Sequence, residues 1–224
     1  MCFSAPASFI VGGTLVALAT LTIAKSNKRS ELPFACIPLL FGLQQSIEGV
    51  VWLTLTRPAL NPFFAHLYLF FSHVLWPVFI PLAVLSLERN AVRRRWLYAL
   101  LAVGVGVGVY LSVVIATNPV TCLIVNHNLD YELANPADML SAFFYLVATI
   151  VSCSISSHKL VRIFGFVLMV LAAFAEQFSR ITFVSLWCFT AAILSLIILV
   201  YFPPLVTRLS PALQLWLEED QAPS

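Results

Sequence analysis

Long apolar runs separated by short polar segments dominate the chain. Windows of about 20 apolar residues, enough for a helix to cross roughly 30 Å of hydrocarbon, fall at 8–24, 32–56, 63–87, 96–116 and 139–157. A further apolar stretch, about twice the length of one span, follows from Ile163 to Phe202 and is interrupted by Glu176, Gln177, Ser179 and Arg180. We expect a tight turn at this interruption, which divides the stretch into helices over 160–176 and 182–202. The pattern therefore predicts an all-α bundle of seven transmembrane helices.

Composition supports this prediction. Of the 224 residues, 61% are hydrophobic and only 10% are charged, whereas a soluble domain carries about 25% charged residues. A soluble globular protein is thereby excluded. The net charge of +2 is too small to indicate nucleic-acid binding. Membrane lipids are the partner that the composition implies.

The positions of the basic residues predict the orientation. Ten of the twelve Lys and Arg residues fall in one set of connections: Lys25, Lys28, Arg29, Arg89, Arg93, Arg94, Arg95, Lys159, Arg162 and Arg208. Basic loops stay in the cytoplasm, so we expect an outside amino terminus, a cytoplasmic carboxyl terminus and a bacterial inner membrane. The loop over 117–138 has no Lys or Arg and is expected outside.

We expect residues 1–202 to form a single transmembrane domain, followed by a cytoplasmic tail over 203–224. Pro203 and Pro204 should end the last helix. In the tail, Ser210 and Pro211 favour a helix start, and apolar residues on one face indicate a short helix lying on the membrane surface. An unstructured tail is an equally good interpretation.

Glu48 is the costliest residue in the predicted spans, because an ionisable group in a bilayer costs about 2.5–3.5 kcal/mol on insertion scales. It lies eight residues before Thr56, which places it about 12 Å below the outer boundary. Gln44 and Gln45 precede it by four and three residues and so share its helix face. The second span therefore carries a polar stripe.

The third span places a histidine at a similar depth. His73 is ten residues after Phe63, or about 15 Å from the outer boundary. His66 lies two turns nearer the mouth on the same face, and Ser72 adds a hydroxyl. Trp76 either walls a pocket there or packs. Pro77 and Pro81 each leave a backbone oxygen without its helical donor, which would allow a kink near His73.

Further polar groups are expected at the same outer end. Glu176, Gln177 and Arg180 end the sixth span, and Glu176 and Arg180 are four residues apart, a spacing at which they can pair. Cys2 contributes a thiol from the outside amino terminus. It shares the oxidising face with Cys122, the only other cysteine predicted there, so a disulfide between them is a further alternative.

Three interpretations of these groups remain open. In the first, His73, Glu48, Glu176, Cys2 and His66 supply nitrogen, oxygen and sulfur ligands to zinc or copper, with Glu48 and Glu176 also serving catalysis in a hydrolase or hydratase. In the second, Glu48 and His73 belong to a proton-coupled carrier of a small solute or ion. In the third, the polar side chains only join helices, at about 0.6–2 kcal/mol each. Either of the first two takes its metal or small ligand from the outer side.

The fourth span carries a separate pattern. Gly104, Gly106 and Gly108 alternate with valine, which predicts a close approach of a neighbouring helix.

The opening Met1-Cys2-Phe3-Ser4-Ala5, the segment Pro38-Leu39-Leu40-Phe41-Gly42-Leu43-Gln44-Gln45 and the segment Glu48-Gly49-Val50-Val51-Trp52 carry a resemblance. They resemble a family of uncharacterised bacterial membrane proteins that begin Met-Cys-Phe-Ser-Ala. The resemblance covers the first two spans closely. It implies that Cys2, Gln45 and Glu48 belong to a shared site, without naming its chemistry.

Overall fold

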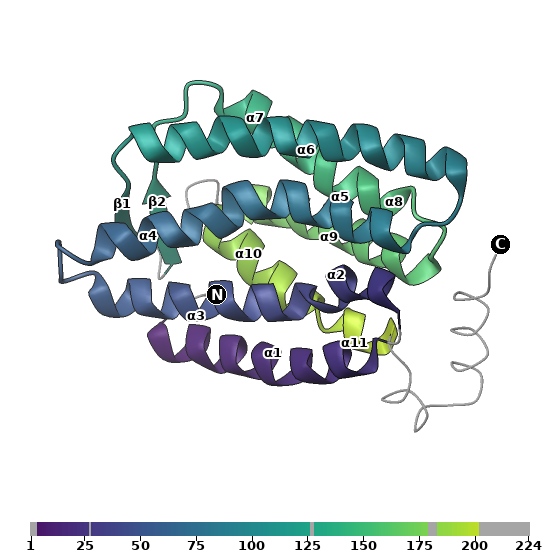
Figure 1. The fold of residues 1–224 in the computed structure, drawn as a ribbon. Coiled ribbons are helices and arrows are strands. Elements are labelled where there is room, and N and C mark those ends of the chain that lie inside the picture. The colour runs from purple at the N-terminus through teal and green to yellow at the C-terminus, as the bar shows by residue number, and fades with distance from the viewer. Residues whose placement is uncertain (1–3, 27, 126–127, 179–182, 202–224) are drawn as a thin grey trace.

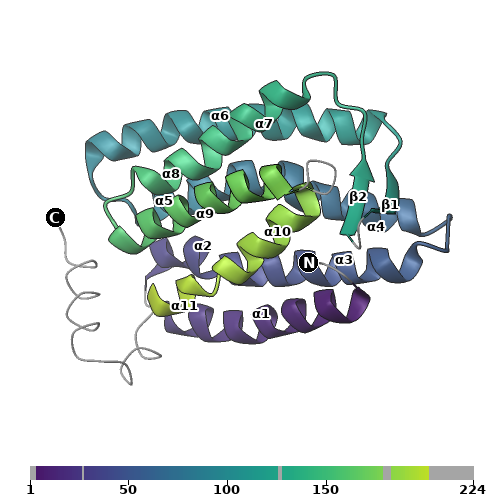
Figure 2. The same cartoon turned by 180° about the vertical axis from the view of Figure 1, so that it is seen from behind.

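The computed structural model describes residues 4–26, 28–125, 128–178 and 183–201. These residues are mostly helical, and the long helices run side by side along one axis (Figures 1 and 2). The helical elements in chain order are α1 (Ala5–Lys25), η1 (Arg29–Glu31), α2 (Leu32–Ala35), α3 (Ile37–Thr54), α4 (Asn61–Leu69), η2 (Phe70–Leu75), α5 (Trp76–Leu87), α6 (Ala91–Thr117), α7 (Asp138–Leu146), η3 (Val147–Val151), α8 (Ser152–Ser154), α9 (Lys159–Phe178), α10 (Phe183–Leu194) and α11 (Ile197–Tyr201).

Five helical stretches among the described residues are long and apolar enough to cross a membrane: Ala5–Lys25, Arg29–Thr54, Asn61–Leu87, Ala91–Thr117 and Val184–Tyr201. Each coincides with a predicted span, so a multi-pass membrane protein is confirmed. The predicted span at 139–157 falls on a shorter apolar helix, Asp138–Ser154, and the span at 160–176 falls on α9. The count of seven spans and the orientation of the termini stay predictions.

Two other expectations fall on residues that the structure does not describe. The tight turn expected between the sixth and seventh spans lies mostly within 179–182, and the Pro203-Pro204 stop and the tail helix lie within 202–224. Both are outside the described residues.

The third span is one helical path with a change of pitch in its middle. Between α4 and α5, residues Phe70–Leu75 form a π-helix, in which the helix is locally wider than an α-helix. This widening comes just before Pro77, which has no N–H to donate to the carbonyl of His73. The irregularity therefore lies where the sequence predicts one.

The glycines of α6 meet this irregular helix. A Cβ atom placed on Gly104 would lie 1.8 Å from the carbonyl oxygen of Pro77, and one on Gly108 would lie 3.2 Å from the carbonyl oxygen of Val74. A Cβ on Gly106 would meet no atom within 4 Å. Two of the three glycines thus provide the predicted close approach, and the oxygen that Pro81 leaves without its helical donor packs against Gly104.

The segment predicted as an outer loop contains a β-hairpin. Strands β1 (Thr121–Val125) and β2 (Asn128–Glu132) pair antiparallel, with Cys122 opposite Tyr131. The expectation of an all-α chain is wrong in this detail. The run Leu123-Ile124-Val125 favours strand, and β2 buries Leu129 and Tyr131 against the bundle.

The two ends of the bundle differ in charge. The hairpin lies at one end, and the turns after α1, after α5 and before α9 lie at the other (Figures 1 and 2). We call the second end the basic end, because it carries Lys25, Lys28, Arg29, Arg89, Arg93, Arg94, Arg95, Lys159 and Arg162. The fold therefore gathers these basic connections at one end, as the sequence predicts. Among the described residues, Arg57 lies in the turn between α3 and α4 at the hairpin end.

The glycine contacts generate a matched pair of variants. We expect Gly104→Ala to lower the thermal unfolding midpoint of the detergent-purified protein, because the new methyl group would press on Pro77 and cost about 1–3 kcal/mol. Gly106→Ala, in the same helix, should leave the midpoint unchanged or raise it by up to about 4 °C, because the new methyl group meets no atom and alanine favours the helix by up to about 1 kcal/mol. Equal effects of the two variants would contradict the packing described for α6.

Candidate functional site

Glu48 lies in the middle of the structure with no exposed surface. The Ser185 hydroxyl of α10 donates a hydrogen bond of 2.8 Å to its Oε1 atom. The two residues are 137 positions apart in the chain. Since the hydrocarbon layer offers no water to a carboxyl group, this contact between α3 and α10 replaces one that water would otherwise make.

The two glutamines join Glu48, as predicted from their spacing. Gln44 and Gln45 are both fully buried. The Oε1 atom of Gln44 accepts a hydrogen bond of 2.7 Å from the indole Nε1 of Trp76, and the Trp76 ring stacks on Phe41 at 3.9 Å between centroids. Trp76 therefore packs within the bundle and also positions a polar side chain beside Glu48.

Aromatic side chains from two other elements pack beside these residues. Tyr68 of α4 is fully buried, and its ring stacks on that of Tyr131 in β2, with 4.5 Å between centroids and 7° between planes. Cys188 of α10 lies beside Tyr68 and Gln44. We call Gln44, Gln45, Glu48, Tyr68, Ser185 and Cys188 the buried polar cluster.

The hairpin contributes a thiol near this cluster. Burial raises the pKa of the Cys122 thiol to about 12, and the nearby carboxylates of Glu48 and Asp130 add to the shift. Asp130 of β2 is itself half-buried, and burial together with the neighbouring Glu132 raises its pKa. The hairpin thus places acidic and thiol groups over the buried cluster and offers it no cation from its described residues.

The predicted histidines make contacts within their own helical path. The Nδ1 atom of His73 lies 2.8 Å from the Ser72 hydroxyl, and the Nδ1 atom of His66 lies 2.6 Å from the carbonyl oxygen of Pro62. The hydroxyl beside His73 is thus that of Ser72, whereas the hydroxyl that donates to Glu48 is that of Ser185. Gln177 lies on α9 with an exposed side chain.

The predicted metal centre stays a prediction. Among the residues that the structure describes, no three His, Cys, Asp or Glu side chains form a group that could hold a metal ion. Three members of the expected outer site, however, fall outside this description: Cys2, Arg180 and the side chain of Glu176.

Sequence reasoning missed the partners that surround Glu48. Ser185, Tyr68 and Cys188 are ordinary residues of apolar helices, and no spacing along the chain links them to Glu48. For Tyr131 the sequence does carry a signal of burial. Leu129 and Tyr131 are two residues apart, a spacing typical of a strand that buries one face.

A second polar cluster lies at the basic end and was also missed. Glu88 is 1% exposed and accepts four hydrogen bonds of 2.7–3.0 Å from Arg89 N, Asn90 N, Ser157 N and Ser157 Oγ. Burial by itself raises the pKa of this carboxyl, but the hydrogen bonds outweigh it and hold the pKa below its usual range. Glu88 therefore ties the end of α5 to the loop before α9.

These observations define the class and then the family. A chain with five helices long and apolar enough to cross a membrane and a fully buried carboxyl group on one of them is a multi-pass membrane protein. Residues 1–208 match the family of unknown function DUF6629, and the chain belongs to that family. No curated protein and no solved structure matches it.

The hydrogen bonds of Glu88 predict a pH-dependent stability. We expect Glu88→Gln to lower the stability at pH 7 by about 1–3 kcal/mol, because hydrogen bonds to a charged group are lost. A lowered folded-state pKa stabilises the protein above the ordinary value of 4.5, and this stabilisation is lost as the pH falls through the folded-state pKa. The gap in unfolding midpoint between wild type and variant should therefore narrow below about pH 4.5.

Ser157→Ala serves as the companion variant, because it removes one of the four donors and leaves the carboxylate in place. At pH 7 this variant should lower the unfolding midpoint, but by less than Glu88→Gln does. The difference in unfolding midpoint between wild type and Glu88→Gln is the decisive measurement. If it stays constant from pH 7 to below about pH 4.5, the charge of the carboxylate is not what stabilises this turn.

Proposed function

We propose that the protein is a proton-linked carrier of a small polar solute, with Glu48 as its proton-binding group. The observation that carries the proposal is the complete burial of Glu48, with the Ser185 hydroxyl of another helix as its hydrogen-bond donor. A carboxyl group inside a membrane protein changes its charge when it takes a proton, and such groups mark proton and substrate pathways.

The two aromatic pairs pack beside the buried polar cluster. Tyr68 stacks on Tyr131 of the hairpin, so this pair joins the hairpin to the helices of the cluster. Phe41 precedes Glu48 by seven residues on α3, about 10 Å nearer the basic end, and it stacks on Trp76. In this proposal the Phe41–Trp76 pair closes the path toward the basic end and the strand that carries Tyr131 closes the path toward the hairpin end, as a carrier requires of its occluded state.

The cluster offers hydrogen-bonding groups of both kinds to such a solute. Gln44 and Gln45 each carry an amide with donor and acceptor atoms, and Ser185 carries a hydroxyl. Because these groups come from α3 and α10, a relative shift of the two helices would break the hydrogen bond between Ser185 and Glu48. The proton state of Glu48 and the arrangement of the helices are therefore coupled in this proposal.

The carrier is a better fit to the described residues than a zinc or copper hydrolase. A catalytic zinc site uses about three protein ligands. The thiols of Cys122 and Cys188 lie close enough to Glu48 to feel its charge, but among the described residues no three His, Cys, Asp or Glu side chains form a group that could hold a metal ion. A hydrolase would depend on Cys2 and Glu176, whose side chains are outside the described residues.

The test is proton movement in liposomes that contain the purified protein and a trapped pH-sensitive dye. Small amino acids, sugars, amines and organic acids are added outside, one at a time. We expect one class to drive proton flux, and we expect Glu48→Gln to reduce that flux at least tenfold, since an amide cannot take up the proton. Glutamine keeps an oxygen that can accept from Ser185, so the variant should fold.

Glu132→Gln is the matched control, because Glu132 is an exposed carboxylate on β2 and its loss should leave the flux unchanged. Two results would contradict the proposal: full flux in a folded Glu48→Gln protein, or no solute-driven proton flux from any of the four classes. Zinc or copper that copurifies with the wild type and is absent from Glu48→Gln would instead favour the metal-dependent enzyme.

A further inference from the structure

A cavity of about 360 Å³ opens at the basic end, far along the bundle from Glu48. Its volume lies within the range of about 300–1,000 Å³ typical of ligand sites. Four parts of the chain that are distant in sequence meet there: the turn after α1, the turn from α5 to α6, the loop before α9 and the end of α11. The cavity is lined by Lys28, Ser30, Glu31, Ser86, Leu87, Glu88, Arg89, Arg94, His158 and Tyr201.

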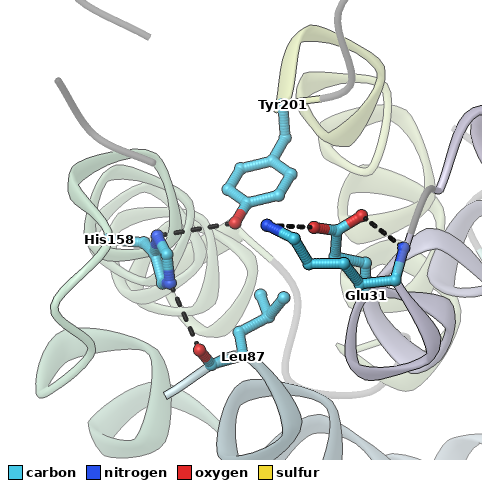
Figure 3. Close-up of polar contacts among 5 residues, drawn as sticks. Glu31, Leu87, His158 and Tyr201 are labelled. Carbon is cyan, nitrogen blue, oxygen red and sulfur yellow. Dashed lines mark hydrogen bonds and ion pairs between the residues drawn. The ribbon is translucent and has the colours of Figure 1, made fainter. Parts of the chain in front are cut away.

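Both carboxylates in this lining are already engaged by the protein. Glu88 accepts the four hydrogen bonds described above, and Glu31 contacts Lys28 through the Nζ atom at 3.6 Å and the backbone N–H at 3.3 Å. The Glu88 contacts join the turn after α5 to the loop before α9, and Figure 3 shows the two contacts made by the Glu31 carboxylate. Neither carboxylate therefore needs an added cation.

The cations of the lining are less fully neutralised. Arg94 donates to three uncharged oxygens, the carbonyls of Leu85 and Glu88 and the hydroxyl of Tyr98. Arg89 has an exposed side chain at the rim. With Lys28, three cationic side chains face two carboxylates, so the cavity carries a net charge of one positive unit before His158 is counted.

A tyrosine hydroxyl and an imidazole ring stand beside these cations. The hydroxyl of Tyr201 lies 3.4 Å from the Nδ1 atom of His158, and the Nε2 atom of the same ring lies 3.4 Å from the carbonyl oxygen of Leu87. Figure 3 shows the Tyr201 hydroxyl between the His158 ring and Glu31. These polar groups therefore form part of the lining beside the three cationic side chains.

We propose that this cavity binds the phosphate group of a phosphate ester, with Arg89, Arg94 and Lys28 as the cationic contacts. Guanidinium groups form short, charge-assisted hydrogen bonds to phosphate oxygens, and a phosphodiester carries the single negative charge that balances the lining. Basic pockets between helix ends on the cytoplasmic side of a membrane take anionic lipid headgroups. A soluble phosphate monoester has the same recognition chemistry, so the experiment distinguishes the two sources.

The test uses the full-length protein in a neutral detergent and native mass spectrometry. Phosphatidylglycerol is titrated in, with diacylglycerol of the same acyl chains as the probe that lacks phosphate. We expect bound phosphatidylglycerol and little bound diacylglycerol. Glycerol 3-phosphate is then added as a competitor: displacement of the lipid indicates a soluble phosphate ester as the source, and retention indicates a membrane lipid.

Arg89→Gln is the test variant, because its exposed side chain can be replaced without loss of a structural contact that the structure records. It should weaken phosphatidylglycerol binding at least about fivefold, because a direct charge-assisted hydrogen bond to the phosphate is lost. Arg95→Gln is the matched control, since Arg95 lies at the same end of α6, is exposed and is not part of the lining. It should change binding by less than about twofold.

Lys28→Gln provides a second variant from a different wall and should weaken binding as Arg89→Gln does. The proposal is overturned if diacylglycerol binds as tightly as phosphatidylglycerol. Equal losses in Arg89→Gln and Arg95→Gln would also overturn it, because such a result reflects the overall positive charge of this end and not the cavity.

Discussion

The hydrogen bond from Ser185 to Glu48 joins the second long apolar helix to the last one, and it is the contact on which the arrangement of the interior depends. A carboxyl group in hydrocarbon must find its partners within the protein. The buried cluster meets this requirement with side chains from α3, α4 and α10. Its position also decides where the aromatic rings of Trp76 and Tyr131 can pack, because they lie against the same side chains.

The two ends of the bundle handle charge in different ways. At the basic end, Glu88 is held by backbone and serine donors, so an acidic residue acts as a connector between α5 and the loop before α9. At the hairpin end, acidic side chains lie over Glu48, and burial raises the pKa of Asp130. A cation or a proton approaching from that side meets a favourable field, whereas the basic end favours anions.

The same separation gives the two proposed sites independent roles. The buried polar cluster contains Glu48, the carboxyl group that we propose takes up a proton. The cavity at the basic end is open, and its cations make contacts mainly with uncharged oxygens. A ligand in that cavity would touch the turn after α1 and the ends of α5 and α11 together, so it would stabilise one arrangement of these helix ends over others.

The sequence by itself determined the features that depend on solvation and on local backbone chemistry. It predicted the multi-pass helical architecture, the grouping of the basic turns, the shared burial of Gln44, Gln45 and Glu48, and the irregular helix before Pro77. Each feature follows from the cost of exposing polar groups to lipid or from the N–H group that proline lacks. Both effects depend on residues that are close together in the sequence, so the sequence alone reveals them. The number of spans and the metal ligands involve segments outside the described residues.

Only the tertiary structure decided which distant side chains meet. Ser185, Tyr68 and Cys188 are unremarkable in sequence, and they become partners of Glu48 only because α4 and α10 pack against α3. Glu88 and Ser157 are 69 residues apart and show no common pattern. In lipid, apolar faces do not select one neighbour over another, so close packing at Gly104 and buried hydrogen bonds fix the pairing of helices, and neither can be read from hydropathy.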